Sequence, residues 1–297
     1  MIISSVYKHG MPIVESIVVE TNQPEIRLCD YCKNRFIHLP SGKSLKKALD
    51  TRRILVNGDS VHATTLVKSG DVLELFIAEH LTSVLEITLH TYYSDDDIAL
   101  IEKPAGLSSS GNLSRSVQHY VSMQFAKSSA PDAIFPARIV HRLDKATSGL
   151  MLIARSANAL MKLGQALEER SIKKTYTTIV HGQMENKGII STEIDNKSAC
   201  TTWVKIADIL HSNSPYCLLE LQPESGRKHQ LRIHLSSIGF PIAGDTEYTI
   251  SGNTIKGRGM MLHASHLEFE HPGSGVRMKF QSELPKRFRK FIERSKI

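Results

Sequence analysis

The chain has 297 residues, of which 41% are hydrophobic and 23% charged, an ordinary composition for a globular protein with one main domain and a smaller one. Its net charge of +7 and pI near 9.2 favour a polyanionic partner. No run of eighteen apolar residues is present, and the first residues lack the basic region and apolar core of a signal peptide, so we expect a cytoplasmic protein that does not bind membranes.

The first predicted unit is a small module over residues 15–80, preceded by a loose leader, residues 1–14. Apolar residues at helical spacing predict a helix over 43–49, with lysines on its other faces. Asn57-Gly58 predicts a tight hairpin turn, and a further strand is expected over 72–78. A basic helix backed by a small hairpin-rich sheet could lay its lysines along an RNA backbone.

Positive charge is concentrated in two segments of the chain. Residues 41–53 carry five basic residues against one acid, and residues 276–297 carry eight against two. A surface that meets phosphates requires such a local concentration. The candidate phosphate contacts of the first segment are Lys43, Lys46, Lys47, Arg52 and Arg53. Solvated helix faces would explain the second segment equally well.

A larger domain is predicted over residues 85–297, after a short linker at 79–84. Residues 85–89 alternate between apolar and polar, as in a half-buried strand. The apolar residues 98–101 then lead into Lys103-Pro104-Ala105-Gly106, where proline removes a donor and glycine permits a left-handed bend. This segment predicts a strand that ends in a rigid turn.

The stretch from His141 to Ser156 is the candidate reactive site. Asp144 stands in a polar loop that Gly149 closes, and the apolar residues Leu150–Ala154 predict a buried strand. A loop fixed to a buried strand can hold a carboxylate rigidly while leaving it open to a large substrate. The plain alternative is a surface loop with an ordinary Arg142–Asp144 charge pair.

Tyr176 begins a predicted strand that follows a helix capped by Ser156. That helix carries Leu160, Leu163 and Leu167 on one face. A tyrosine at the start of a strand is usually a packing residue with its hydroxyl at the rim.

A helix is predicted within residues 225–238. An apolar stripe at i, i+4 and i+7 should face the core: Leu231, Leu235 and Ile238. A different face is shared by His229, Arg232 and Ser236. An arginine beside a packed stripe is held in position, so Arg232 is a candidate functional cation.

Five segments in this order resemble the motifs of pseudouridine synthases of the RluA type. They are Lys103–Gly106, His141–Ala154, Lys174–Tyr176, Gly226–His234 and Leu262–Ala264. The resemblance implies an α/β (α+β) pseudouridine-synthase fold, with a mixed, largely antiparallel sheet and flanking helices. The N-terminal module is similar to an S4-type RNA-binding module at Arg27-Leu28, Lys43–Ala48, Val56–Gly58 and Gly70–Val72, although Cys29 stands where an aspartate is common.

The resemblance implies that the protein isomerises uridine to pseudouridine in RNA. This reaction involves no net oxidation and no outside group, so we expect no cofactor and no metal. The implied catalytic residues are Asp144 as the carboxylate, Arg232 as the cation that keeps it charged, and Tyr176 stacked on the base. The implied substrate contacts are His141, Arg142 and Leu231, with Arg142 filling the gap left by the flipped nucleotide.

Several alternatives stay open at this point. Asp144 could attack the anomeric carbon, remove a sugar proton or add to the base ring. Ribosomal RNA is favoured as the substrate and transfer RNA is the second choice, and we expect a monomer. A non-catalytic RNA-binding or ribosome-assembly protein on the same fold would explain the basic segments. A metal-dependent phosphoesterase lacks a compact ligand set, because Cys29 and Cys32 have no second cysteine pair.

Overall fold

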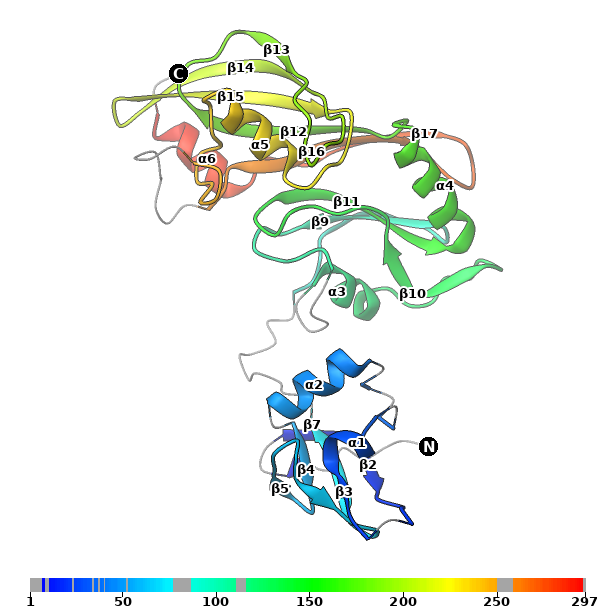
Figure 1. Cartoon of the computed structure of the whole chain (residues 1–297). Helices are drawn as coiled ribbons and strands as arrows, with labels where there is room; N and C mark the ends of the chain where they lie inside the picture. The colour runs from blue at the N-terminus through cyan, green and yellow to red at the C-terminus, as the bar shows by residue number, and fades with distance from the viewer. Residues whose placement is uncertain are drawn as a thin grey trace. The chain divides into compact units, whose positions relative to one another are not determined.

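A computed structural model describes residues 7–8, 11–22, 24–33, 35–36, 38–39, 41–51, 53–76, 87–110, 116–249 and 259–295. The chain divides into two compact units, residues 1–86 and 87–297 (Figure 1). Among the described residues, no helix is long and apolar enough to cross a membrane. The predicted linker at 79–84 lies outside the described residues.

The N-terminal unit is a small sheet with two helices. Its main sheet has the order β1-β2-β7-β4-β5, and β3 pairs separately with β6. The strands are β1 (Tyr7–Lys8), β2 (Met11–Val18), β3 (Ile26–Arg27), β4 (Ile54–Val56), β5 (Asp59–Ser60), β6 (Leu66–Val67) and β7 (Val72–Phe76). The helices are α1 (Leu28–Tyr31) and α2 (Gly42–Asp50). The predicted leader was wrong in part, because β2 begins at Met11 and pairs with β7.

Helix α2 confirms the predicted basic helix. It begins after Ser41, whose hydroxyl accepts the Ser44 N–H at 3.1 Å and completes a capping box. Its apolar face is buried in the core of the unit, through Leu45, Ala48 and Leu49. Its exposed face carries Lys43, Lys46 and Lys47.

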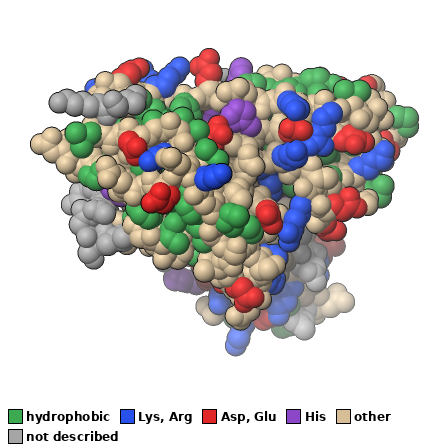
Figure 2. Space-filling view, turned by 90° about the horizontal axis from the view of Figure 1, so that it is seen from above, with side chains coloured by type: hydrophobic (Ala, Val, Ile, Leu, Met, Phe, Trp, Pro, Cys, Tyr) green, Lys and Arg blue, Asp and Glu red, His purple; other side chains and the backbone are tan. Residues whose placement is uncertain are grey.

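The larger unit is built on a ten-stranded sheet. Eight of its strands follow the order β13-β14-β15-β12-β16-β11-β9-β8, and the other two, β10 and β17, pair with β11 and β16. The strands are β8 (Thr91–Ser94), β9 (Ile98–Lys103), β10 (Ala133–Ile139), β11 (Ser148–Ser156), β12 (Lys173–His181), β13 (Lys187–Ile190), β14 (Thr201–His211), β15 (Ser214–Pro223), β16 (Leu262–Glu270) and β17 (Arg277–Gln281). The helices are α3 (Val117–Gln124), α4 (Ala157–Glu168), α5 (Gln230–Ser237) and α6 (Lys286–Glu293). The predicted mixed, largely antiparallel sheet with flanking helices is confirmed. On the face shown in Figure 2, acidic and basic side chains are interspersed.

Strand β11 pairs with three other strands of this sheet, β9, β10 and β16. It pairs antiparallel with β9 and parallel with β16, where Gly149 lies opposite Ala264. Gly149 has φ +122°, and a Cβ on it would lie 2.3 Å from the Ala264 carbonyl oxygen. The two strands can approach this closely only because residue 149 has no side chain.

Two local predictions differ from the structure. Residues 87–90 form no strand, because both the N–H and the carbonyl of Leu89 bond the side chain of Gln124 instead of a neighbouring strand. In α4, which Ser156 caps as predicted, Leu160 is 36% exposed and Ala159 is buried beside Leu163. The buried stripe of α4 therefore starts one residue earlier than predicted.

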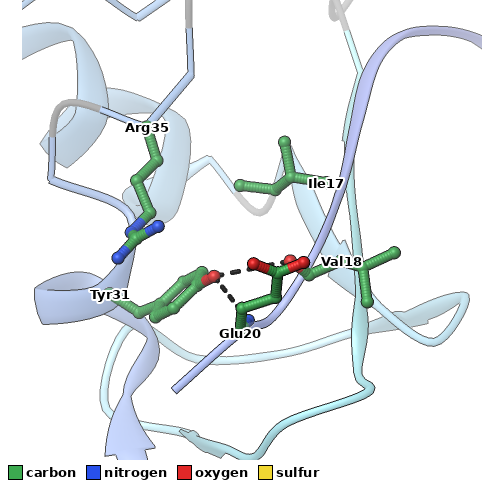
Figure 3. Close-up of a pocket in the computed structure, with 5 residues that line it drawn as sticks. All are labelled: Ile17, Val18, Glu20, Tyr31 and Arg35. Carbon is green, nitrogen blue, oxygen red and sulfur yellow. Dashed lines mark hydrogen bonds between the residues drawn. The ribbon is translucent and has the colours of Figure 1, made fainter. Parts of the chain in front are cut away.

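The N-terminal unit also has a cavity of about 570 Å³, lined by Ile17, Val18, Glu20, Tyr31 and Arg35 (Figure 3). The Tyr31 hydroxyl accepts the Glu20 N–H at 2.8 Å, and the Arg35 guanidinium lies 4.2 Å from the centre of the tyrosine ring. None of the predicted site residues lines this cavity.

Candidate active site

Asp144 lies in the loop between β10 and β11, and buried polar contacts hold that loop from below. The Lys103 side chain at the end of β9 is fully buried. Its ammonium donates to the carbonyls of Thr147 at 2.6 Å, Pro104 at 2.9 Å and Lys145 at 3.3 Å. Burial lowers the pKa of Lys103 to about 7, and the charge of Asp144 opposes that shift. The residues after Asp144 are therefore fixed to the turn that follows β9.

Two further contacts fix the residues before Asp144. The Ser109 hydroxyl donates to the Leu143 carbonyl at 2.6 Å and accepts the Leu143 N–H at 3.0 Å. The His141 Nε2 accepts the Leu152 N–H at 3.1 Å. Both sides of Asp144 are thus anchored, while its carboxylate stays 27% exposed.

Arg232 lies in α5 and presents one nitrogen to Asp144. Its Nη1 is 3.9 Å from the Asp144 Oδ2. Closer partners hold the rest of the guanidinium, since Nε and Nη2 donate to Asp245 at 2.6 and 2.8 Å and Nη2 also donates to Glu247 at 3.0 Å. Burial acts to raise the pKa of Asp245, but the hydrogen bonds from Arg232 and from backbone N–H groups outweigh it and lower that pKa. Asp245 thereby orients the guanidinium toward the Asp144 loop.

His229 is a second group beside Asp144. It precedes α5 with a left-handed φ of +56°, so it does not continue the helical face that the sequence predicts for it. Its Nε2 lies 3.8 Å from the Asp144 Oδ1, and its Nδ1 lies 2.9 Å from the Tyr248 hydroxyl. The Arg232 guanidinium lies 4.7 Å from the centre of the Tyr248 ring.

Sequence reasoning gave no role to Asp245, Glu247 or Tyr248. Asp245 and Tyr248 follow the segment Gly226–His234 and lie within twenty residues of Arg232. An acidic residue near a predicted functional arginine is the signal that would have suggested an ion-pair partner.

Tyr176 lies in β12, between Leu221 of β15 and Ala264 of β16. The side chain is 9% exposed. Burial and then the charge of Asp144 raise its pKa well above the ordinary value, so the hydroxyl is neutral. Ala264, the partner of Tyr176 in β16, also pairs with Gly149 at the end of the Asp144 loop, so Tyr176 lies beside that loop.

The structure separates the remaining predicted site residues into three groups. Arg142 is exposed. Leu231 is buried in the core of the larger unit, 7% exposed. The N-terminal unit holds Lys43, Lys46, Lys47 and Arg53, while Arg52 lies outside the described residues. The described residues contain no group of three or more His, Cys, Asp or Glu arranged to hold a metal ion.

The chemistry of this arrangement follows from its charges. A partly exposed carboxylate stands on a fixed loop, with a guanidinium and an imidazole each within 4 Å of one of its oxygens. Such a group can act as a nucleophile or a base toward a substrate in the open part of the site. The neutral phenol of Tyr176 adds an aromatic wall.

Comparison with known proteins gives a consistent result. A model of the family described as RNA pseudouridylate synthase matches residues 97–237. The uncharacterized RNA pseudouridine synthase YlyB of Bacillus subtilis is 31% identical over 262 residues, which cover 81% of this chain and 85% of that protein. Ribosomal large subunit pseudouridine synthase D of Pseudomonas aeruginosa is 32% identical, with 80% and 82% covered. Ribosomal large subunit pseudouridine synthase C of Rickettsia typhi is 29% identical, with 91% and 97% covered.

A solved structure, human RNA pseudouridylate synthase domain containing 1, matches with a TM-score of 0.56 at 24% identity, over 67% of this chain and 84% of that chain. This likeness shows a shared fold.

Proposed function

The chain belongs to the RNA pseudouridylate synthase family and is an RNA pseudouridine synthase, and we propose that its substrate is the RNA of the large ribosomal subunit. Two of its relatives carry that substrate in their names, one of them matching 91% of this chain. Transfer RNA is the alternative substrate. The monomeric state and the cytoplasmic location expected from the sequence stay predictions.

We propose Asp144 as the catalytic carboxylate. The observation that carries this proposal is its position on a doubly anchored loop, partly exposed, with Nη1 of Arg232 at 3.9 Å. All three routes to the product, through the anomeric carbon, a sugar proton or the base ring, need an ionised carboxylate beside the nucleoside. Arg232 places a positive charge beside this carboxylate.

Tyr176 and Arg142 would handle the target nucleotide. The flat face of Tyr176 is suited to stack on an extruded uracil, and its neutral hydroxyl is able to relay the proton lost from the base carbon. Arg142 is exposed two residues before Asp144, where its side chain could occupy the space that the flipped base leaves. His141 and Leu231 remain predicted substrate contacts, although the His141 Nε2 already accepts a backbone N–H.

We propose further that residues 15–80 act as an S4-like RNA-binding module. The support is α2, whose buried apolar face leaves Lys43, Lys46 and Lys47 exposed together. Replacing all three by alanine should weaken RNA binding and lower the slope of log Kd against log salt by about 2, at roughly 0.7 per phosphate contact on single-stranded RNA. An unchanged slope, measured by filter binding from low to high salt, would show that α2 does not touch RNA.

The central experiment compares RNA from cells with and without the gene by carbodiimide labelling and primer extension. We expect a pseudouridine in large-subunit ribosomal RNA to disappear on deletion and to return with the wild type but not with Asp144→Asn. Asp195→Asn is a matched control, because Asp195 is exposed in the same unit and its φ of +52° suits asparagine. Restoration by Asp144→Asn would refute the catalytic assignment, and loss of a site in transfer RNA alone would replace the proposed substrate. If no site is lost, the non-catalytic binding protein becomes the better interpretation.

A further inference from the structure

Lys174 lies in β12, two residues before Tyr176. The pairing of β12 with β16 shifts register between Thr175 and Tyr176, so the place of the Lys174 side chain follows from its neighbours and not from strand alternation. Lys174 is half-buried, whereas its neighbour Lys173 is exposed and points to the opposite face.

Both loops of the active site lie close to the Lys174 ammonium. A Cβ on Gly226, in the segment that leads to His229 and Arg232, would lie 3.9 Å from the Lys174 Nζ. On the other side is His141 of the Asp144 loop, whose pKa is lowered to about 3, first by burial and then by the charge of Lys174. The ammonium thus stands at the place where the two loops meet.

The part of the chain that the structure describes supplies no counter-ion for this ammonium. Among the described residues, no hydrogen bond or ion pair involves the Lys174 Nζ, and burial lowers its pKa. Lys103 shows the contrast, because three carbonyls surround its buried ammonium. A half-buried charge without an acidic partner costs free energy in the protein alone, and an anionic group of a ligand would offset that cost.

We propose that Lys174 binds the phosphodiester next to the target uridine, with its Nζ donating to a non-bridging phosphate oxygen. This inference rests on the proposed function, since it takes the base to lie against Tyr176. A nucleotide that stacks there brings its phosphate to the two loops beside the Lys174 ammonium, which has no ion-pair partner among the described residues. The contact would fix the register of the RNA strand so that the ribose faces Asp144.

The test uses the full-length enzyme and a synthetic stem-loop containing the uridine identified by mapping. Lys174→Met keeps the aliphatic stem and removes the charge, and Lys173→Met is the matched control on the opposite face. We expect Lys174→Met to raise KM about tenfold to a hundredfold, as for loss of a hydrogen bond to a charged group, with a smaller change in kcat. Lys173→Met should stay within about twofold of the wild type, and Lys174→Arg should recover part of the loss.

A second measurement identifies the phosphate. Replacing single phosphates of the stem-loop by uncharged methylphosphonates should weaken wild-type binding at one linkage beside the target uridine. This loss of affinity at the neutral linkage should vanish in Lys174→Met and persist in Lys173→Met. All binding measurements use proteins that also carry Asp144→Asn, which prevents turnover. Should methionine at 174 prevent folding, Lys174→Gln takes its place, with circular dichroism as the check.

The outcomes separate the two levels of the argument. If the wild type modifies the stem-loop but Lys174→Met behaves like Lys173→Met, the phosphate contact is refuted and Lys174 only fills space. The same holds if the penalty at the neutral linkage persists without the Lys174 charge. If the wild type modifies no ribosomal RNA fragment, the proposed function itself fails.

Discussion

Acidification should destabilise the larger unit through His263, which is fully buried in β16. Its Nδ1 lies 2.9 Å from the Ser148 hydroxyl and its Nε2 lies 3.0 Å from the Ser282 hydroxyl. Burial, followed by the charges of Arg287 and His266, lowers its pKa to about 4. Because an unfolded histidine titrates near 6.5, the unfolded chain binds the proton first as pH falls.

The size of the effect follows from linkage. The stabilisation is fully present above pH 6.5 and is lost as pH falls toward 4, at about 1.4 kcal/mol per pH unit. Between pH 7 and pH 5 the loss from His263 is therefore about 2 kcal/mol. For a unit of this size that corresponds to a fall in Tm of roughly 4–8 °C.

The assay is urea unfolding followed by tryptophan fluorescence. Trp203, the single tryptophan, lies in β14 and therefore reports on the larger unit. Other histidines also titrate in this range, so the quantity to compare is the difference in unfolding free energy between wild type and His263→Gln. We expect that difference to shrink by about 2 kcal/mol from pH 7 to pH 5. An equal difference at both pH values would refute the reasoning.

Four further substitutions test how the larger unit and its site are held. Lys103→Met should lower kcat about a hundredfold with a smaller change in KM, because the segment around the Asp144 loop loses three anchoring hydrogen bonds. An unaltered single-turnover rate constant would contradict this. Gly149→Ala should prevent folding, because its Cβ would lie 2.3 Å from a backbone oxygen. Gly164→Ala in α4 should raise the free energy of unfolding by roughly 0.5–1 kcal/mol, because nothing lies within 4 Å of the added Cβ. Circular dichroism shows whether each variant folds, and Tm measures the change in stability. Asp245→Asn should lower the free energy of unfolding in urea by about 2 kcal/mol, because the buried Arg232 guanidinium loses a charged partner. An unchanged urea midpoint would argue against that pairing.

Features with a local cause could be predicted from the sequence. The helix at 42–50 follows from a capping serine and an apolar spacing, and the hairpin at Asn57-Gly58 follows from two residues that accept positive φ. The strand after Asp144 follows from a short apolar run. The family followed from motifs whose order along the chain is itself sequence information, and the match to residues 97–237 agrees with it.

Features that depend on long-range packing were decided by the tertiary structure. The sequence pairs Arg232 with Asp144, but the closest partner of Arg232 is the buried Asp245, with Asp144 at 3.9 Å. Lys103 looks like part of a turn in the sequence, yet its ammonium holds a loop more than forty residues away. Leu89 fits a strand pattern, but its backbone bonds Gln124 of α3. In each case the partner that satisfies a buried polar group is brought near by the fold, and the spacing of residues along the chain carries no record of that distance.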